Sequence, residues 1–110
     1  MAITPFLQNH GPINSLGFRF GRFAYSTDVV GLDDKAFDAL AGVEVWMVDA
    51  LQRKPHKTHS HVAQTLRWIE RVKSRRAILH HMNASMDYAT VAAQMPEGVE
   101  PAYDGMVLEM

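Results

Sequence analysis

Histidine residues are concentrated in one part of this sequence. The chain of 110 residues contains six histidines, and five of them lie between His56 and His81. The imidazole of histidine exchanges a proton near neutral pH and is the commonest protein ligand for metal ions. Folding alone does not require such a concentration. The pattern therefore predicts a site for metal binding or for proton transfer.

Other residues able to do chemistry follow the strands that the sequence predicts. Asp28, Asp49 and the pair His80–His81 each come soon after an expected strand, and His10 precedes a glycine turn. In a parallel or mixed sheet, the carboxyl ends of the strands form the edge at which ligands bind. We therefore expect these side chains to meet at one edge of a sheet.

The combination of histidine and aspartate indicates a particular class of metal. Such ligands favour zinc, manganese or iron, and one carboxylate can bridge two ions in a hydrolytic site. Each residue alone also has an ordinary structural interpretation. A single aspartate at a strand end commonly forms a turn or caps a helix, and a single histidine is commonly a hydrogen-bonded loop residue. The joint pattern, rather than any one residue, predicts a metal site.

The segment from His56 to His61 allows two interpretations. It leads into an expected helix, whose first N–H groups and positive dipole attract phosphate or carboxylate. A histidine in this segment could bind a metal or deliver a proton near neutral pH. The alternative is that Thr58 caps the helix and that the histidines are solvated. The spacing alone does not decide between them.

Strands and helices are expected to alternate around these residues. The expected strands are 15–20, 22–26, 43–48, 77–79 and 106–109, and the expected helices are 32–41, 58–73 and 87–94. Gly21 and Arg22 suit a two-residue hairpin turn. Apolar residues at helical spacing between Val62 and Val72 predict the most regular helix. This order predicts one α/β domain with a mixed sheet and about three helices, spanning residues 1–110.

The composition narrows the class of protein. Eleven basic and twelve acidic side chains leave a formal charge of -1, which gives no electrostatic reason to expect nucleic-acid binding. No cysteine is present, so disulfides and thiolate metal sites are excluded and a cytoplasmic location is expected. No stretch approaches the roughly 18 apolar residues that cross a membrane. Trp46, Met47, Trp68 and Met82 are expected to pack in the core.

A series of short motifs covers almost the whole chain. They read Pro-Phe-Leu-Gln-Asn-His10-Gly, Ser-Leu-Gly-Phe-Arg, Ala-Tyr-Ser-Thr-Asp28, Val-Asp49-Ala-Leu, Pro-His56-Lys-Thr-His59, Ile-Leu-His-His81-Met, Asp87-Tyr and Val-Glu-Pro-Ala-Tyr-Asp104-Gly-Met. Together and in this order, they resemble the carboxyl-terminal half of metallo-β-lactamase-fold hydrolases. The most similar subgroup is the phosphoribosyl cyclic phosphodiesterase-like one.

This resemblance implies a fold and a mechanism. The family has a four-layer αβ/βα sandwich, of which this chain would be one αβ half. Its site holds two zinc or manganese ions that activate a water against a phosphodiester. Carried over residue by residue, the resemblance implies that His10 and His81 bind metal and that Asp28 bridges both ions. It implies that His59 contacts the substrate phosphate or protonates the leaving oxygen.

The sequence departs from the family in two places. The motif His-x-His-x-Asp-His, which supplies most of the remaining ligands in the amino-terminal half of the family, does not occur in it. His80 stands where relatives usually have threonine. We expect a replacement rather than an added ligand, because adjacent strand residues point to opposite faces. The roles of His56, His61 and His80 stay open.

The missing motif predicts an incomplete site. Three ligands shared between two ions give each ion fewer protein groups than the three that a catalytic zinc normally keeps. We therefore expect weak metal binding until an amino-terminal half from another chain completes the site for a small phosphodiester substrate. The alternative is a non-catalytic interaction or weak metal-binding module, a truncated remnant that self-associates through an exposed apolar sheet face.

Overall fold

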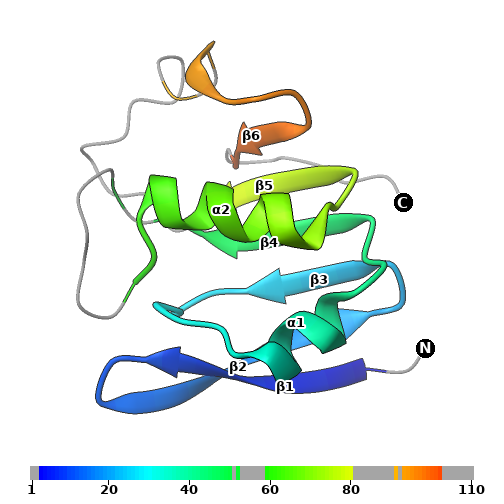
Figure 1. Cartoon of the computed structure of the whole chain (residues 1–110), viewed down its shortest axis with the longest axis vertical. Helices are drawn as coiled ribbons and strands as arrows, with labels where there is room; N and C mark the ends of the chain where they lie inside the picture. The colour runs from blue at the N-terminus through cyan, green and yellow to red at the C-terminus, as the bar shows by residue number, and fades with distance from the viewer. Residues whose placement is uncertain (1–2, 51, 53–58, 81–90, 92, 103–110) are drawn as a thin grey trace.

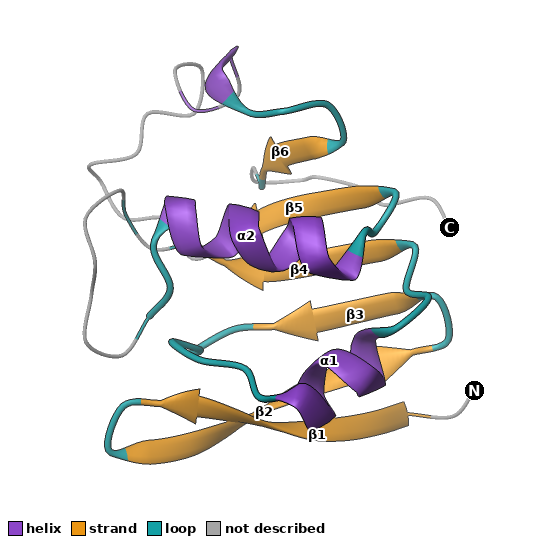
Figure 2. Cartoon of the chain, in the orientation of Figure 1, coloured by secondary structure: helices purple, strands orange, loops and turns teal. Residues whose placement is uncertain are grey.

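The structure is a computed structural model that describes residues 3–50, 52, 59–80, 91 and 93–102. Its elements, in chain order, are β1 (Ile3–His10), β2 (Ile13–Phe20), β3 (Phe23–Ser26), α1 (Asp34–Leu40), β4 (Val45–Asp49), α2 (Val62–Val72), β5 (Arg76–His80) and β6 (Val99–Pro101). These strands form one sheet in the order β1-β2-β3-β4-β5-β6. Helices α1 and α2 lie on the same face of this sheet (Figures 1 and 2).

The first three strands form an antiparallel meander. β1 pairs with β2 along its whole length, and β2 pairs with β3. Gly21, at φ 59°, and Arg22 make the turn between β2 and β3, which places Phe20 opposite Phe23 and confirms the predicted hairpin. The sequence pattern does not predict β1. Its Pro5 argues against a central strand, but proline is tolerated here because β1 lies at the edge of the sheet.

The strands from β3 to β6 are all parallel to their neighbours. Their carboxyl ends therefore lie at one edge of the sheet. β1 runs in the same direction as β3, because two antiparallel pairings separate them, so His10 reaches the same edge. Asp28 follows β3, while Asp49 and His80 end β4 and β5 as register partners. The predicted meeting of these residues at one edge is confirmed.

The two helices have identifiable boundaries. Asp33 precedes α1, and its side chain accepts a hydrogen bond from the backbone N–H of Ala36, which caps the helix. α2 follows His61 and so begins later than the cap predicted at Thr58, which lies outside the described residues. α2 ends at Val72 and is capped by Lys73, whose backbone is left-handed with φ 59°. Directly before α2, Ser60 donates to the carbonyl of Val29, which places residues 59–61 at the carboxyl edge of the sheet.

Some expected elements fall outside the residues that the structure describes. Of the helix expected at 87–94, only residues 91, 93 and 94 are described, and all are helical. The strand expected at 106–109 is wholly outside. β6 is present although the sequence pattern does not predict it, and it adds a short parallel strand beside β5.

The core lies between the sheet and the two helices. Trp46 is fully buried and Trp68 is 9% exposed, so both pack as predicted. Met47 is half-buried, and Met82 lies outside the described residues. Among the described residues, no helix is both long enough and apolar enough to cross a membrane.

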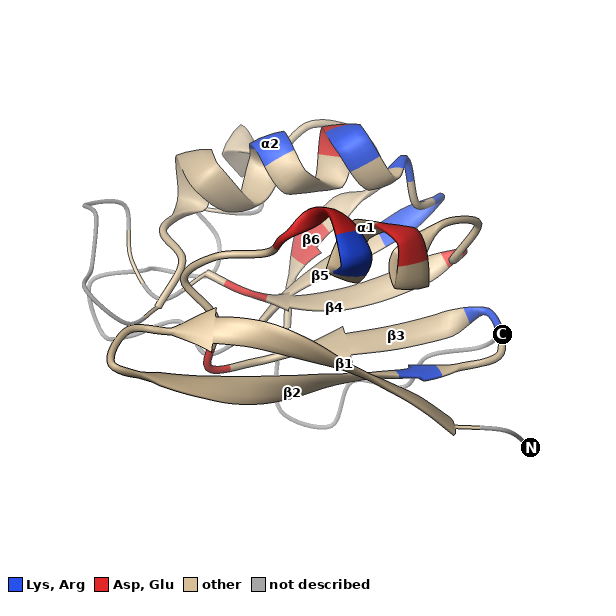
Figure 3. Ribbon diagram, turned by 60° about the horizontal axis from the view of Figure 1, so that its bottom comes forward, with Lys and Arg blue, Asp and Glu red and all other residues tan. Residues whose placement is uncertain are grey.

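The hairpin of β1 and β2 carries exposed apolar side chains on strands with a single charge. Ile3, Leu7, Ile13 and Leu16 are 56%, 61%, 63% and 47% exposed. Leu7 and Leu16 are direct register partners. Arg19 is the only charged residue in either strand, and Figure 3 shows how little charge the two ribbons carry. By the register, Ile3, Leu7 and Leu16 point to one face of the hairpin and Ile13 points to the other, and we refer to Ile3, Leu7 and Leu16 as the hairpin surface.

Candidate metal centre

The turn after β3 positions Asp28. This residue has φ 53°, in the left-handed region that non-glycine residues seldom adopt, although aspartate tolerates it better than most. The backbone of the next two residues, Val29 and Val30, makes hydrogen bonds to two other segments of the chain. Val30 donates to the carbonyl of Asn9 at 2.7 Å, and Ser60 donates to the carbonyl of Val29 at 2.6 Å. The turn therefore connects the end of β1 with the segment that precedes α2.

Three of the residues singled out in the sequence converge at this point. His10, Asp28 and His59 each offer one ligand atom within 4.8 Å of the other two. The rings of His10 and His59 meet edge to face, with centroids 5.0 Å apart. All three residues are partly exposed, so solutes have access to them. We call His10, Asp28 and His59 the candidate metal centre.

The donor set of the candidate metal centre fits a divalent metal ion. Two imidazole nitrogens and a carboxylate oxygen are the ligands that zinc and related ions accept. The exposed fraction of the Asp28 side chain is 47%, so its carboxylate is accessible to an incoming ion. The residues present therefore fit the metal that the resemblance implies.

Asp49 lies behind the centre and contacts two parts of it. Its side chain is fully buried, and Oδ2 accepts hydrogen bonds from Nδ1 of His59 at 2.8 Å and from the backbone N–H of Val29 at 3.2 Å. Nδ1 of His59 lies farther from Oδ1 of Asp28, at 3.9 Å. With the proton assigned to Nδ1, Nε2 of His59 is the nitrogen directed to ligand chemistry. A carboxylate that fixes an imidazole in this way suits either a metal ligand or a proton donor.

The structure says less about the other predicted site residues. His81, the remaining predicted metal ligand, and His56 lie outside the described residues, so the role of His81 stays a prediction. His61 is the cap residue of α2, and its side chain makes no capping hydrogen bond. His80 ends β5, where its ring lies edge-on to Tyr25 with centroids 5.6 Å apart. Its position at the sheet edge is the one predicted for it.

Sequence reasoning brings Asp49 to the correct edge but gives it no role. The available signal is a charged residue directly after a strand of apolar residues, which must find a hydrogen-bonding partner if it is buried. The partner itself cannot be identified this way. His59 is ten residues away along the chain and reaches Asp49 only because the segment before α2 returns to the sheet edge.

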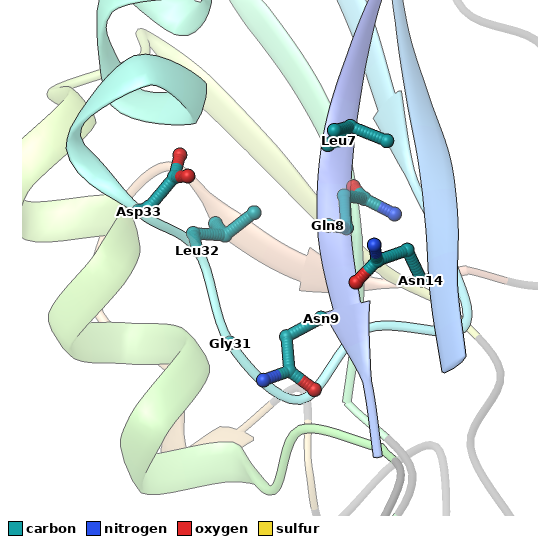
Figure 4. Close-up of a pocket in the computed structure, with 7 residues that line it drawn as sticks. All are labelled: Leu7, Gln8, Asn9, Asn14, Gly31, Leu32 and Asp33. Carbon is teal, nitrogen blue, oxygen red and sulfur yellow. The ribbon is translucent and has the colours of Figure 1, made fainter. Parts of the chain in front are cut away.

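A hollow of about 390 Å³ lies beside β1, separate from the candidate metal centre (Figure 4). Its lining consists of Leu7, Gln8, Asn9, Asn14, Gly31, Leu32 and Asp33. The carboxylate of Asp33 is already engaged as the cap of α1. The lining is otherwise amide and aliphatic, and none of its residues belongs to the centre.

The chain is similar to a known family and to solved structures. Residues 1–82 match the family described as the Beta-lactamase superfamily domain. A structure described as a new diphosphatase from the PhnP family is 31% identical with a TM-score of 0.96, over 98% of this chain and 43% of that one. The metallo-β-lactamase fold protein YhfI from Bacillus subtilis is 12% identical with a TM-score of 0.73, over 94% and 47%, a likeness of fold alone.

One curated protein is also similar in sequence. An octanoyltransferase of Porphyromonas gingivalis (strain ATCC BAA-308 / W83) is 22% identical over 111 residues, which are 96% of this chain and 22% of that protein. The chain thus spans less than half the length of each of these relatives.

Proposed function

The chain belongs to the family of β-lactamase superfamily domains, and on this premise we propose that it is part of a metal-dependent phosphodiesterase-type hydrolase. The observation that carries the proposal is the convergence of His10, Asp28 and His59 to within 4.8 Å at the carboxyl edge of the sheet. The similarity to a PhnP-family diphosphatase supports hydrolysis of a phosphate ester or anhydride as the reaction class. Zinc or manganese is the metal we propose.

Each residue of the site has a proposed task. A divalent metal, when bound, supplies activation of water and polarisation of the phosphoryl group. His10, His81 and the carboxylate of Asp28 would hold the metal, with Asp28 shared between two ions. His59, oriented by Asp49, contacts the substrate phosphate or gives a proton to the leaving oxygen. These tasks separate metal binding from proton transfer, so they can be tested separately.

We propose that a second half of the fold completes this site. The sequence holds no His-x-His-x-Asp-His motif, and the chain covers 43% of the diphosphatase that it resembles. The missing half, either from the same protein or from another chain, would add the remaining metal ligands. The hairpin surface, apolar and exposed, offers an area for such a half to contact. We expect a small phosphodiester as substrate and a cytoplasmic location.

The proposal is tested by complementation. The chain is purified alone and mixed with an amino-terminal half that carries the motif His-x-His-x-Asp-His. Zinc and manganese are measured by atomic emission, and hydrolysis of bis(p-nitrophenyl) phosphate is followed in parallel. We expect the chain alone to bind metal weakly and to hydrolyse little, and the mixture to gain both properties. The same mixture made with Asp28→Asn is the matched control for contaminating hydrolases.

Two results would contradict parts of this proposal. A tight site for two ions in the isolated chain would show that no second half is required. A mixture that assembles but binds no metal would contradict hydrolysis and favour the second candidate, a non-catalytic module that self-associates through the hairpin surface. The octanoyltransferase similarity gives no third candidate, because it covers only 22% of that protein at 22% identity and does not show which part of it carries the activity.

A further inference from the structure

The turn that carries Asp28 is held by side chains at four consecutive residues. The bonded pairs are Ser26 with Trp46, Thr27 with Gln8, Asp28 with Ser15, and Val29 with Asp49. The four partners come from β1, β2 and β4. Hydrogen bonds from three other strands therefore fix this turn in place.

Two of these partners act on the backbone of the turn from the β1–β2 hairpin. Nε2 of Gln8 donates to the carbonyl of Thr27 at 3.0 Å, and Oγ of Ser15 donates to the carbonyl of Asp28 at 2.7 Å. Gln8 also donates to Oγ of Ser15 at 3.1 Å, so the two side chains are bonded to each other. The pair thus links the hairpin directly to the residue with the left-handed backbone.

The position of Gln8 is costly for a polar side chain. The residue is 2% exposed, and burying an amide is unfavourable unless its hydrogen bonds are satisfied. Gly17 makes the space for it. A Cβ atom at Gly17 would overlap the ring of Phe6 and would come within 2.5 Å of Oε1 of Gln8. The hairpin therefore accommodates a buried amide at a position where an apolar side chain would be buried at a lower free-energy cost.

A strained backbone explains why such a pair is present. A left-handed aspartate persists only where its surroundings over-determine it. Both bonds from the hairpin reach carbonyl groups at or next to residue 28, whereas the carboxylate of Asp28 faces the candidate metal centre. Holding the two carbonyls fixes the direction in which the carboxylate leaves the backbone.

We infer that Gln8 and Ser15 are positioning residues, which hold the carboxylate of Asp28 in place for the metal ion. This inference rests on the proposed function, because it assigns the pair a task in metal binding. It predicts that removal of either side chain weakens metal binding although neither touches the metal.

The test compares Ser15→Ala, Gln8→Leu and Ser15→Thr with the unaltered chain. One measurement is the dissociation constant for Zn²⁺ by calorimetry, and the second is amide hydrogen exchange of Val29 in the metal-free protein. We expect Ser15→Ala and Gln8→Leu to weaken zinc binding by about three- to tenfold, the effect of one lost hydrogen bond. We expect the Val29 amide, which donates to Asp49, to exchange faster by a similar factor. Ser15→Thr keeps a hydroxyl and should restore both values.

Two control variants separate positioning from general loss of stability. Asn14→Ala removes an exposed amide next to Ser15 in β2, and Val43→Ala makes a cavity in the core close to the start of β4, at the opposite edge of the sheet. Both should leave the zinc dissociation constant within twofold. Equal weakening by Val43→Ala and Ser15→Ala, or unchanged zinc binding in both hairpin variants, would overturn the inference. If neither the unaltered chain nor its mixture with the amino-terminal half bound zinc, the proposed function would fail, whereas Val29 exchange would still report whether the pair holds the turn.

Discussion

Asp28 is the residue on which the proposed hydrolase depends most directly. In the complemented protein, Asp28→Asn should abolish hydrolysis and lower the metal content, because a neutral amide offers one acceptor oxygen where a carboxylate serves two cations. The fold should survive, since asparagine also tolerates the left-handed region. Metal content and turnover are measured on the same preparation. Asp38→Asn, an exposed carboxylate of α1, is the control and should change neither. Full metal content in the Asp28 variant would show that Asp28 is not a ligand.

His59 should behave differently from Asp28 if its task is proton transfer. In the complemented protein, His59→Ala should leave metal content intact and reduce kcat by roughly 10²–10⁴, the usual contribution of a positioned proton donor. The 2.8 Å hydrogen bond to Asp49 orients its ring for this task. His10→Ala is the comparison, because it should lose metal and activity together. An equal loss of metal in both variants would identify His59 as a ligand, a role that its place beside His10 and Asp28 also allows.

The residues of the site were predictable by type, but their supporting residues were not. Asp28 could be chosen because it follows an expected strand, His10 because it precedes a glycine turn, and His59 because it lies in the histidine-rich segment that leads into a helix. Their separate roles came from the family resemblance. Gln8 carries no such signal, since its importance comes from a contact with Thr27, 19 residues away. Asp49 is an intermediate case, visible as a charge after an apolar strand but with an unidentifiable partner. Contacts of this kind depend on register, which a periodic pattern does not specify.

At the scale of elements, the C-terminal end of α2 offers a direct test of backbone strain. Lys73 has φ 59° and ψ 39°, and its N–H donates to the carbonyl of Ile69. Lys73→Gly should raise the free energy of unfolding by about 1 kcal/mol, because glycine adopts this conformation without a Cβ penalty. Chemical denaturation measures it. Glu70→Gly, the same replacement at an exposed position inside α2, should lower stability by a similar amount. A loss of stability in the Lys73 variant would mean that its side chain contributes more than its backbone costs.

Strands with a continuous apolar pattern were predicted from the sequence, whereas the strands at the edges of the sheet were not. The expected strands at 43–48 and 77–79 correspond to β4 and β5, because a strand covered on both faces reads as a continuous apolar run. β1 and β6 are edge strands and lack this signal. In β1 only Phe6 and Gln8 are buried, and one of them is polar. The alternation that usually identifies a strand is therefore hidden where a buried amide replaces an apolar residue.

At the scale of the whole molecule, the hairpin surface should make the isolated chain self-associate. Leu7 and Leu16 are opposite each other and 61% and 47% exposed, on strands with one charged residue between them, and a contiguous apolar surface of this kind favours association. Sedimentation velocity at micromolar concentration should therefore show a dimer or a larger assembly.

The assembly should depend on these two leucines. The double variant Leu7→Glu, Leu16→Glu should sediment as a monomer, because dimerisation would bring like charges together in a desolvated contact. Arg67→Glu, on the exposed face of α2, is the matched charge control and should leave the assembly unchanged. If an amino-terminal half binds the same surface, adding it should dissociate the assembly of the unaltered chain and yield a one-to-one complex. A monodisperse monomer of the unaltered chain would contradict this prediction, and an assembly that survives both glutamates would place the contact on another part of the molecule.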